Sequence, residues 1–131
     1  SDLAWSFRRS PIALGASMEA MDRILSLPDR PTAVVATNDV LAVGAMTACR
    51  QQGVRIPEDI SITGVDNTDL GATQTPGLTS VRTPIVEVGR ASAAHLIARL
   101  EGRPVSLREE FPFELVLRGS TGPVQIAATR A

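Results

Sequence analysis

The chain has 131 residues and a formal net charge of −1, because 13 basic side chains, all of them Arg, nearly balance 14 acidic ones. This length permits one domain, the 44% of apolar residues can form a hydrophobic core, and the balanced charge argues against direct binding of nucleic-acid phosphates. The single Cys excludes an intrachain disulfide, and one Cys with one His is too little for an ordinary zinc site, so we expect no metal and no cofactor.

Apolar periodicity and turn residues predict alternating helices and strands. Met18, Met21 and Leu25 fall on one face of an amphipathic helix, which Pro28 ends. Short apolar runs bounded by turn residues are typical of strands buried on both faces. The predicted elements are a helix over 16–27, a strand over 33–36, a helix over 40–52, a strand over 60–65, a short strand or crossover over 78–81, a helix over 85–100 and a strand over 113–118. Irregular structure is expected over 1–11, apart from a short strand near Trp5, and a loose tail over 121–131.

This alternation predicts an α/β fold in which helices flank a parallel sheet. In such sheets ligands bind beyond the carboxyl ends of the strands. Asn38 follows the first of the two buried apolar runs and Asp66 follows the second, so these polar side chains are candidates for a binding site. Asp39 is expected to be structural, because it precedes a helix whose first N–H groups need acceptors.

Three segments carry a resemblance to a known family. In this order and spacing, they resemble the effector-binding region of the LacI/GalR family of bacterial transcription regulators; the segments are 31–45 (PTAVVATNDVLAVGA), 53–67 (GVRIPEDISITGVDN) and 76–84 (PGLTSVRTP). The resemblance implies a periplasmic-binding-protein-like fold of two subdomains, with most of the C-terminal one in this chain. It also implies that residues 1–120 are part of an effector-binding and dimerisation domain. The helix over 85–100 would then belong to an N-terminal subdomain outside this chain, as would the DNA-binding headpiece.

The resemblance also implies an effector site. Asp66 matches a position whose carboxylate accepts hydrogen bonds from ligand hydroxyls, Asn38 matches a second ligand-contacting position, and Ile85 matches a pocket-wall position. Trp5 matches the ring-stacking position if the following loop is longer than usual, whereas Ser10 matches it without an insertion. The alternatives stay open at this point: Asp66 as a turn cap, Asn38 as a residue that shapes the strand-to-helix turn, and Trp5 as a core or edge-strand residue.

The predicted helix over 40–52 is apolar or small on almost every side, which exceeds what a helix on the outside of a sheet requires. In the family this helix and the loop after Asp66 form the dimer contact. The resemblance therefore implies a dimer interface with the candidates Val43, Met46, Thr47, Arg50 and Leu70. The alternative is that another part of the same subunit covers the helix. The apolar stripe of the helix over 85–100 is expected to lack its usual partner.

The function that we expect is effector sensing and dimerisation in a LacI-family regulator. Its effector would be a sugar or a nucleoside, its operator DNA would be bound through a headpiece that this chain lacks, and it would act as a homodimer. A fragment of a periplasmic sugar-binding transport protein is the alternative, although such a protein needs a secretion signal. No signal peptide and no bilayer-length apolar run occur, which predicts a cytoplasmic protein without a membrane partner. An enzyme is not expected, because no nucleophile or base accompanies the carboxylates near Asp66.

Overall fold

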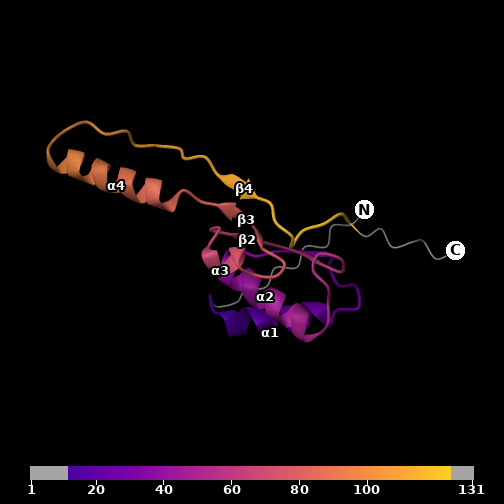
Figure 1. Ribbon diagram of the computed structural model, residues 1–131. Helices are drawn as coiled ribbons and strands as arrows, with labels where there is room; N and C mark the ends of the chain where they lie inside the picture. Colours follow the sequence, from indigo (N-terminus) through magenta and orange to yellow (C-terminus); the bar gives the residue numbers. More distant parts are fainter. Residues whose placement is uncertain (1–11, 125–131) are drawn as a thin grey trace.

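The computed structural model describes residues 12–124 (Figure 1). Every helix and strand predicted within this range is confirmed, with boundaries shifted by a few residues, and one short helix after the second strand was not predicted. In chain order the elements are α1 (Leu14–Leu25), β1 (Ala33–Val35), α2 (Asp39–Gln51), β2 (Ser61–Val65), α3 (Asp69–Ala72), β3 (Thr79–Arg82), α4 (Ile85–Leu100) and β4 (Glu114–Val116). Trp5 and most of the predicted C-terminal tail lie outside the described residues.

The strands form one sheet in the order β1-β2-β3-β4. β1 pairs parallel with β2, and β2 pairs parallel with β3, which confirms the predicted parallel core of the sheet. β4 pairs antiparallel with β3, so the expectation of a wholly parallel sheet is wrong at this edge. The reason is visible in Figure 1: the chain leaves β3 along α4 and then runs back along that helix, so it re-enters the sheet in the opposite direction.

The hydrophobic core lies where α2 packs between α1 and the sheet (Figure 1). Met21 of α1, Met46 of α2 and Ile62 of β2 are fully buried there. The helices approach closely at Gly44, where an added Cβ would collide with the Ser17 side chain and lie 2.7 Å from a backbone carbonyl oxygen of α1. The close approach of α1 and α2 therefore requires glycine at position 44.

The first strand differs from its predicted environment. β1 lies at the edge of the described sheet, and Val35 is 79% exposed, so the expectation that this strand is buried on both faces is wrong for the described part of the chain. The free edge of β1 has no partner strand within residues 12–124. β2 fits the expectation better, because Ile62 and Gly64 are buried and the intervening side chains are half-buried.

α4 and residues 101–113 extend away from the remaining described residues (Figure 1). We call this segment the arm, and the rest of the described structure the body. Large apolar side chains of α4 stay exposed on the arm, namely Ile85, Val86, Val88, Leu96, Ile97 and Leu100. Within the described residues these apolar side chains remain uncovered. None of the described helices combines the length and the apolar character needed to cross a membrane.

Candidate functional site

Three predicted site residues follow the carboxyl ends of three adjacent parallel strands. Asn38 follows β1, Asp66 follows β2, and Ile85 follows β3. The register pairs Val35 with Thr63 and Val65 with Val81, so the three strands end along one edge of the sheet. This edge is the place where doubly wound α/β folds bind ligands. Ile85, the first residue of α4, is 62% exposed there.

Asn38 is the N-cap of α2. Its Oδ1 accepts a hydrogen bond from the Leu41 N–H at 2.9 Å, which satisfies one of the otherwise unpaired donors of the first helical turn. This bond shapes the strand-to-helix turn, which is the alternative role considered for Asn38. The amide nitrogen of the same side chain is a separate donor, so the capping bond leaves Asn38 able to donate to a ligand oxygen.

The backbone turns sharply at Asp66 and Asn67. Both residues have positive φ, 100° at Asp66 and 52° at Asn67, which is a conformation that non-glycine residues rarely adopt. The Asp66 N–H donates to the Val81 carbonyl at 2.9 Å and thereby closes the β2–β3 ladder. Within residues 12–124 the half-buried Asp66 carboxylate accepts no hydrogen bond and forms no ion pair, so the bond expected of a turn cap is not present.

Asp39 holds this turn from beneath, and its carboxylate is 1% exposed. Its Oδ2 accepts hydrogen bonds from the Thr68 N–H at 2.6 Å and from the Thr68 hydroxyl at 2.9 Å. Its Oδ1 accepts from the Ser80 hydroxyl at 2.6 Å, and the Ser80 oxygen in turn accepts from the Asn67 N–H at 3.0 Å. Glycine at position 71 leaves room for the carboxylate, because a Cβ there would lie 3.1 Å from Oδ2.

The structural role predicted for Asp39 is confirmed, but its targets differ from those expected. The sequence suggested that Asp39 caps the helix, whereas Asn38 provides the cap and Asp39 binds the loop after β2. A buried carboxylate needs hydrogen-bond donors or a cation. The three donors come from positions 29 and 41 residues away, so no local motif could identify them.

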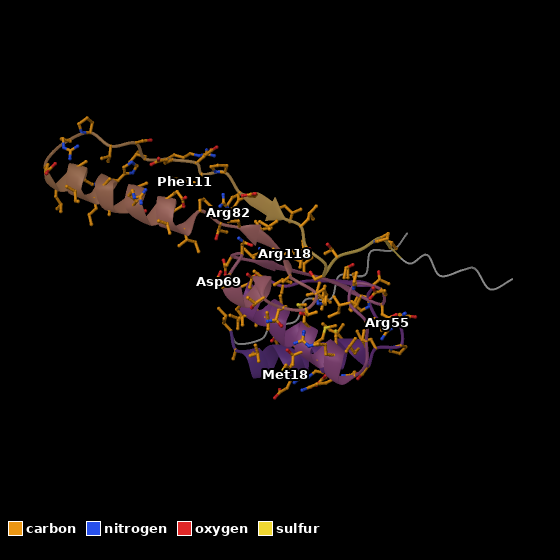
Figure 2. The ribbon with its side chains drawn as sticks, viewed as in Figure 1. Met18, Arg55, Asp69, Arg82, Phe111 and Arg118 are labelled. Carbon is orange, nitrogen blue, oxygen red and sulfur yellow. The ribbon has the colours of Figure 1, made fainter. Side chains whose placement is uncertain are left out.

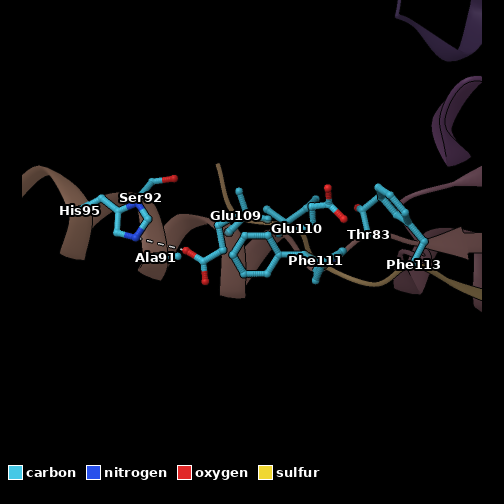
Figure 3. Close-up of a pocket in the computed structure, with 11 residues that line it drawn as sticks. Thr83, Ala91, Ser92, His95, Glu109, Glu110, Phe111 and Phe113 are labelled. Carbon is cyan, nitrogen blue, oxygen red and sulfur yellow. Dashed lines mark ion pairs between the residues drawn. The ribbon is translucent and has the colours of Figure 1, made fainter. Parts of the chain in front are cut away.

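A groove lies on the arm, between α4 and the segment that returns toward the body (Figure 3). Its volume is about 840 Å³, and its lining is mostly apolar, with Val88, Phe111 and Phe113 among the contributors. His95 Nε2 lies 3.2 Å from Glu109 Oε2 across the groove, and the His95 side chain is partly buried. Neither Asn38 nor Asp66 lines this groove, and among the predicted effector residues that the structure describes only Ile85 does.

The predicted dimer-interface residues divide into two groups. Met46 is 0% exposed and Val43 is 4% exposed, so almost nothing of either side chain reaches the surface. α1 and β2 both pack on α2. The excess of apolar residues in this helix is therefore accounted for by the alternative, in which other parts of the same subunit cover it. Thr47, Arg50 and Leu70 lie at or near the surface, and Arg50 Nη2 donates to Thr47 Oγ1 at 3.0 Å.

The thiol of Cys49 is buried in the hydrophobic core. Burial raises the pKa of the Cys49 thiol to about 11. Within the described residues no group of three or more His, Cys, Asp or Glu side chains could hold a metal ion. What this edge of the sheet does offer is a carboxylate acceptor, an amide donor and an apolar wall.

Comparison with known proteins identifies the family. Residues 4–121 match the model of the periplasmic binding protein-like domain. The HTH-type transcriptional repressor CytR of Escherichia coli K12 is 39% identical over 114 residues, which cover 86% of this chain but 33% of the repressor. The chain therefore spans about a third of the length of this curated relative.

Similar solved structures are also LacI-family transcription regulators. A LacI family transcriptional regulator from Bifidobacterium animalis subsp. lactis superposes with a TM-score of 0.84 at 34% identity, over 88% of this chain and 43% of that one. Another, from Arthrobacter sp. FB24 in complex with lactose, gives 0.80 at 32% identity, over 91% and 45%. These relatives are transcription regulators, which does not favour the alternative of a transport protein. The chain belongs to the periplasmic binding protein-like domain family, and it corresponds to the effector-binding region of LacI-family transcription regulators.

Proposed function

We propose that this chain binds a small polyhydroxylated effector, a sugar or a nucleoside, as part of a LacI-family transcription regulator, with Asp66 as its principal hydrogen-bond acceptor. The observation that carries the proposal is the Asp66 carboxylate, which is half-buried at the edge where three parallel strands end and accepts no hydrogen bond from the described residues. An ionised carboxylate offers two oxygens to adjacent hydroxyls, and charge-assisted hydrogen bonds are the stronger kind.

The neighbouring residues have complementary roles in this proposal. The Asn38 amide nitrogen donates to an effector oxygen while its Oδ1 keeps the α2 cap. Ile85 supplies an apolar wall where the chain passes into α4. Trp5, which lies outside the described residues, is proposed as the aromatic surface against which a ring stacks. The lactose bound by the Arthrobacter relative supports a sugar as the effector class.

We further propose how the arm and the body are arranged in the whole regulator. Residues 1–120 would form part of the effector-binding and dimerisation domain, and α4 would pack its exposed apolar side chains on an N-terminal subdomain outside this chain. The effector would bind between the two subdomains and shift the balance between their closure states. Because paired headpieces must lie about one helical turn of DNA apart, a homodimer is part of the mechanism. The regulator would act on operator DNA in the cytoplasm.

The proposed dimer surface is the group of accessible candidates Thr47, Arg50 and Leu70, with Leu70 44% exposed. Arg50 joins the end of α2 to the segment after α3, because its Nη2 also lies 3.4 Å from Gln74 Oε1. These residues therefore form one continuous face of the body. Sedimentation of the full-length gene product tests this part of the proposal, and a monomer at micromolar concentration contradicts it.

Thermal denaturation and DNA binding of the full-length gene product test the function. Lactose, ribose, cytidine and adenosine are added separately at millimolar concentration, with glycine betaine as a control solute without hydroxyl groups. A ligand at about 100 times its Kd stabilises by about 2.7 kcal/mol, which raises the midpoint by several degrees. We expect one probe to do so and to change the binding of a DNA fragment from upstream of the gene. A protein that binds none of the four probes and no such DNA contradicts the proposal.

A further inference from the structure

The turn that carries Asp66 is also held from the side of β4. Arg118 follows β4, 51 residues after Asn67 in the chain, and its Nη2 donates to Asn67 Oδ1 at 2.7 Å. Its Nη1 donates to the Leu78 carbonyl, also at 2.7 Å. Its backbone N–H donates to Thr79 Oγ1 at 2.9 Å. The guanidinium is therefore held at both ends of its fork, by Asn67 on one side and by the Leu78 carbonyl just before β3 on the other. Figure 2 shows Arg118 where the segment after β4 meets the body.

This arrangement differs from an ordinary surface ion pair. Arg118 is half-buried, and no carboxylate within the described residues lies within 4 Å of its guanidinium. Both acceptors are neutral oxygens, so its charge strengthens two directed hydrogen bonds instead of neutralising an acid. Room for the side chain depends on Gly77, where an added Cβ would lie 3.1 Å from Arg118 Cδ.

Asn67 needs such a restraint because of its backbone. Two successive non-glycine residues with positive φ are unfavourable by themselves, and such a turn persists only when surrounding groups hold it. Asp39 and Ser80 restrain the N–H groups of Thr68 and Asn67 from the buried side. Arg118 restrains the Asn67 side chain from the other. The orientation of the adjacent Asp66 carboxylate follows from both restraints together.

We propose that Arg118 is a positioning residue of the effector site, acting through Asn67 to fix the left-handed turn that presents Asp66. This inference rests on the proposed effector role of Asp66. Arg118 lies on the segment that returns from the arm, so the same hydrogen bond ties the effector-binding turn to the connection between the arm and the body. A change in the direction of the arm would thereby reach Asp66 through the hydrogen bond between the Arg118 and Asn67 side chains.

Hydrogen exchange of the full-length gene product without effector tests the positioning directly. The N–H groups of Asp66, Asn67 and Thr68 are all hydrogen-bonded and so report the turn. Arg118→Met keeps the stem but removes both side-chain donors, and it is expected to speed exchange at these three amides about tenfold, with α2 amides unchanged. Arg118→Lys, which can donate to one acceptor, is expected to restore protection in part. Unchanged exchange at the three amides in Arg118→Met overturns the proposal.

A double-mutant cycle tests the route through Asn67. Asn67→Gly still permits the positive φ but removes the whole side chain, including the acceptor of Arg118, so the restraint by Arg118 is lost as it is in Arg118→Met. In the double variant, amide exchange at the turn is expected to increase no more than in the more strongly affected single variant. Fully additive increases would show that Arg118 does not act through Asn67. The probe that shifts the wild-type midpoint, from among lactose, ribose, cytidine and adenosine, should bind both single variants about tenfold more weakly.

Different results would refute the proposed function and the positioning role of Arg118. A wild-type protein that binds none of the probes and no DNA from upstream of the gene refutes the proposed function, whatever the exchange at the turn. Unaltered affinity in Arg118→Met, in a wild-type background that binds a probe, refutes the positioning role while leaving the function intact. Faster exchange at the three turn amides, unchanged exchange in α2 and weaker probe binding together support both the proposed function and the positioning role.

Discussion

The buried carboxylate of Asp39 gives a stability prediction that can be worked from its contacts. Asp39→Ala removes the acceptor of three hydrogen bonds and leaves the Thr68 N–H, the Thr68 hydroxyl and the Ser80 hydroxyl without partners near the core. An unsatisfied buried donor costs about 1–3 kcal/mol. Part of this loss of stability is offset, because Asp39 is 1% exposed and removing its carboxylate also removes the free-energy cost of burying a charge. We expect a net loss of about 3–5 kcal/mol in the free energy of unfolding.

Asp39→Asn separates charge from shape. The amide oxygen can still accept from Thr68, but the amide nitrogen cannot accept the Ser80 hydroxyl proton, so the expected loss is about 1.5–3 kcal/mol. Equilibrium urea denaturation followed by far-ultraviolet circular dichroism measures both variants. Asp69→Asn is the matched control, because Asp69 is an exposed carboxylate at the start of α3, directly after the same turn, and its change should stay within about 0.5 kcal/mol. A loss below about 0.5 kcal/mol in Asp39→Ala refutes the reasoning.

Three further predictions concern packing and ionisation. Gly44→Ala is expected to destabilise by about 1–3 kcal/mol in the same denaturation experiment, because its methyl group would collide with α1; a neutral result means that the helices can separate without loss. Cys49, whose pKa burial raises to about 11, is expected to react with iodoacetamide at pH 8 far more slowly than in the urea-unfolded chain, and equal rates contradict this. The hydrogen bonds from Arg55 hold the pKa of Asp59 at about 2, against 3.8 when unperturbed. The stabilisation that this pair provides is therefore present above pH 4 and is lost as the pH falls through 2. The difference in thermal midpoint between wild type and Asp59→Asn should therefore shrink between pH 4 and pH 2, and a constant difference argues against the pair.

Elements with strong local signals were predictable from the sequence. The helices keep their apolar periodicity, and Asn38 stands at the strand-to-helix boundary as N-caps commonly do. The position of Asp66 at the carboxyl end of a parallel strand followed from the alternation of elements alone. These features depend on neighbours within a few residues, and that is the range over which a sequence pattern is informative.

Features that depend on distant partners were not predictable. The burial of Met46 follows from α1 packing on α2, which no pattern within the helix reveals. The antiparallel direction of β4 follows from the return of the chain along the arm. The contacts of Asp39 and Arg118 join residues 29 to 51 positions apart, so their roles at the turn appear only in three dimensions.

Titration calorimetry of Asp66→Asn in the full-length gene product tests the central claim most directly. The probe is whichever of lactose, ribose, cytidine and adenosine binds the wild-type protein, and Asp69→Asn is the control. The substitution keeps the shape of Asp66 but removes its charge and one acceptor, and loss of a charge-assisted hydrogen bond should weaken binding about 10- to 100-fold. We predict that loss for Asp66→Asn and wild-type affinity for Asp69→Asn. Equal affinity in all three proteins would contradict the assignment of Asp66 to the effector site.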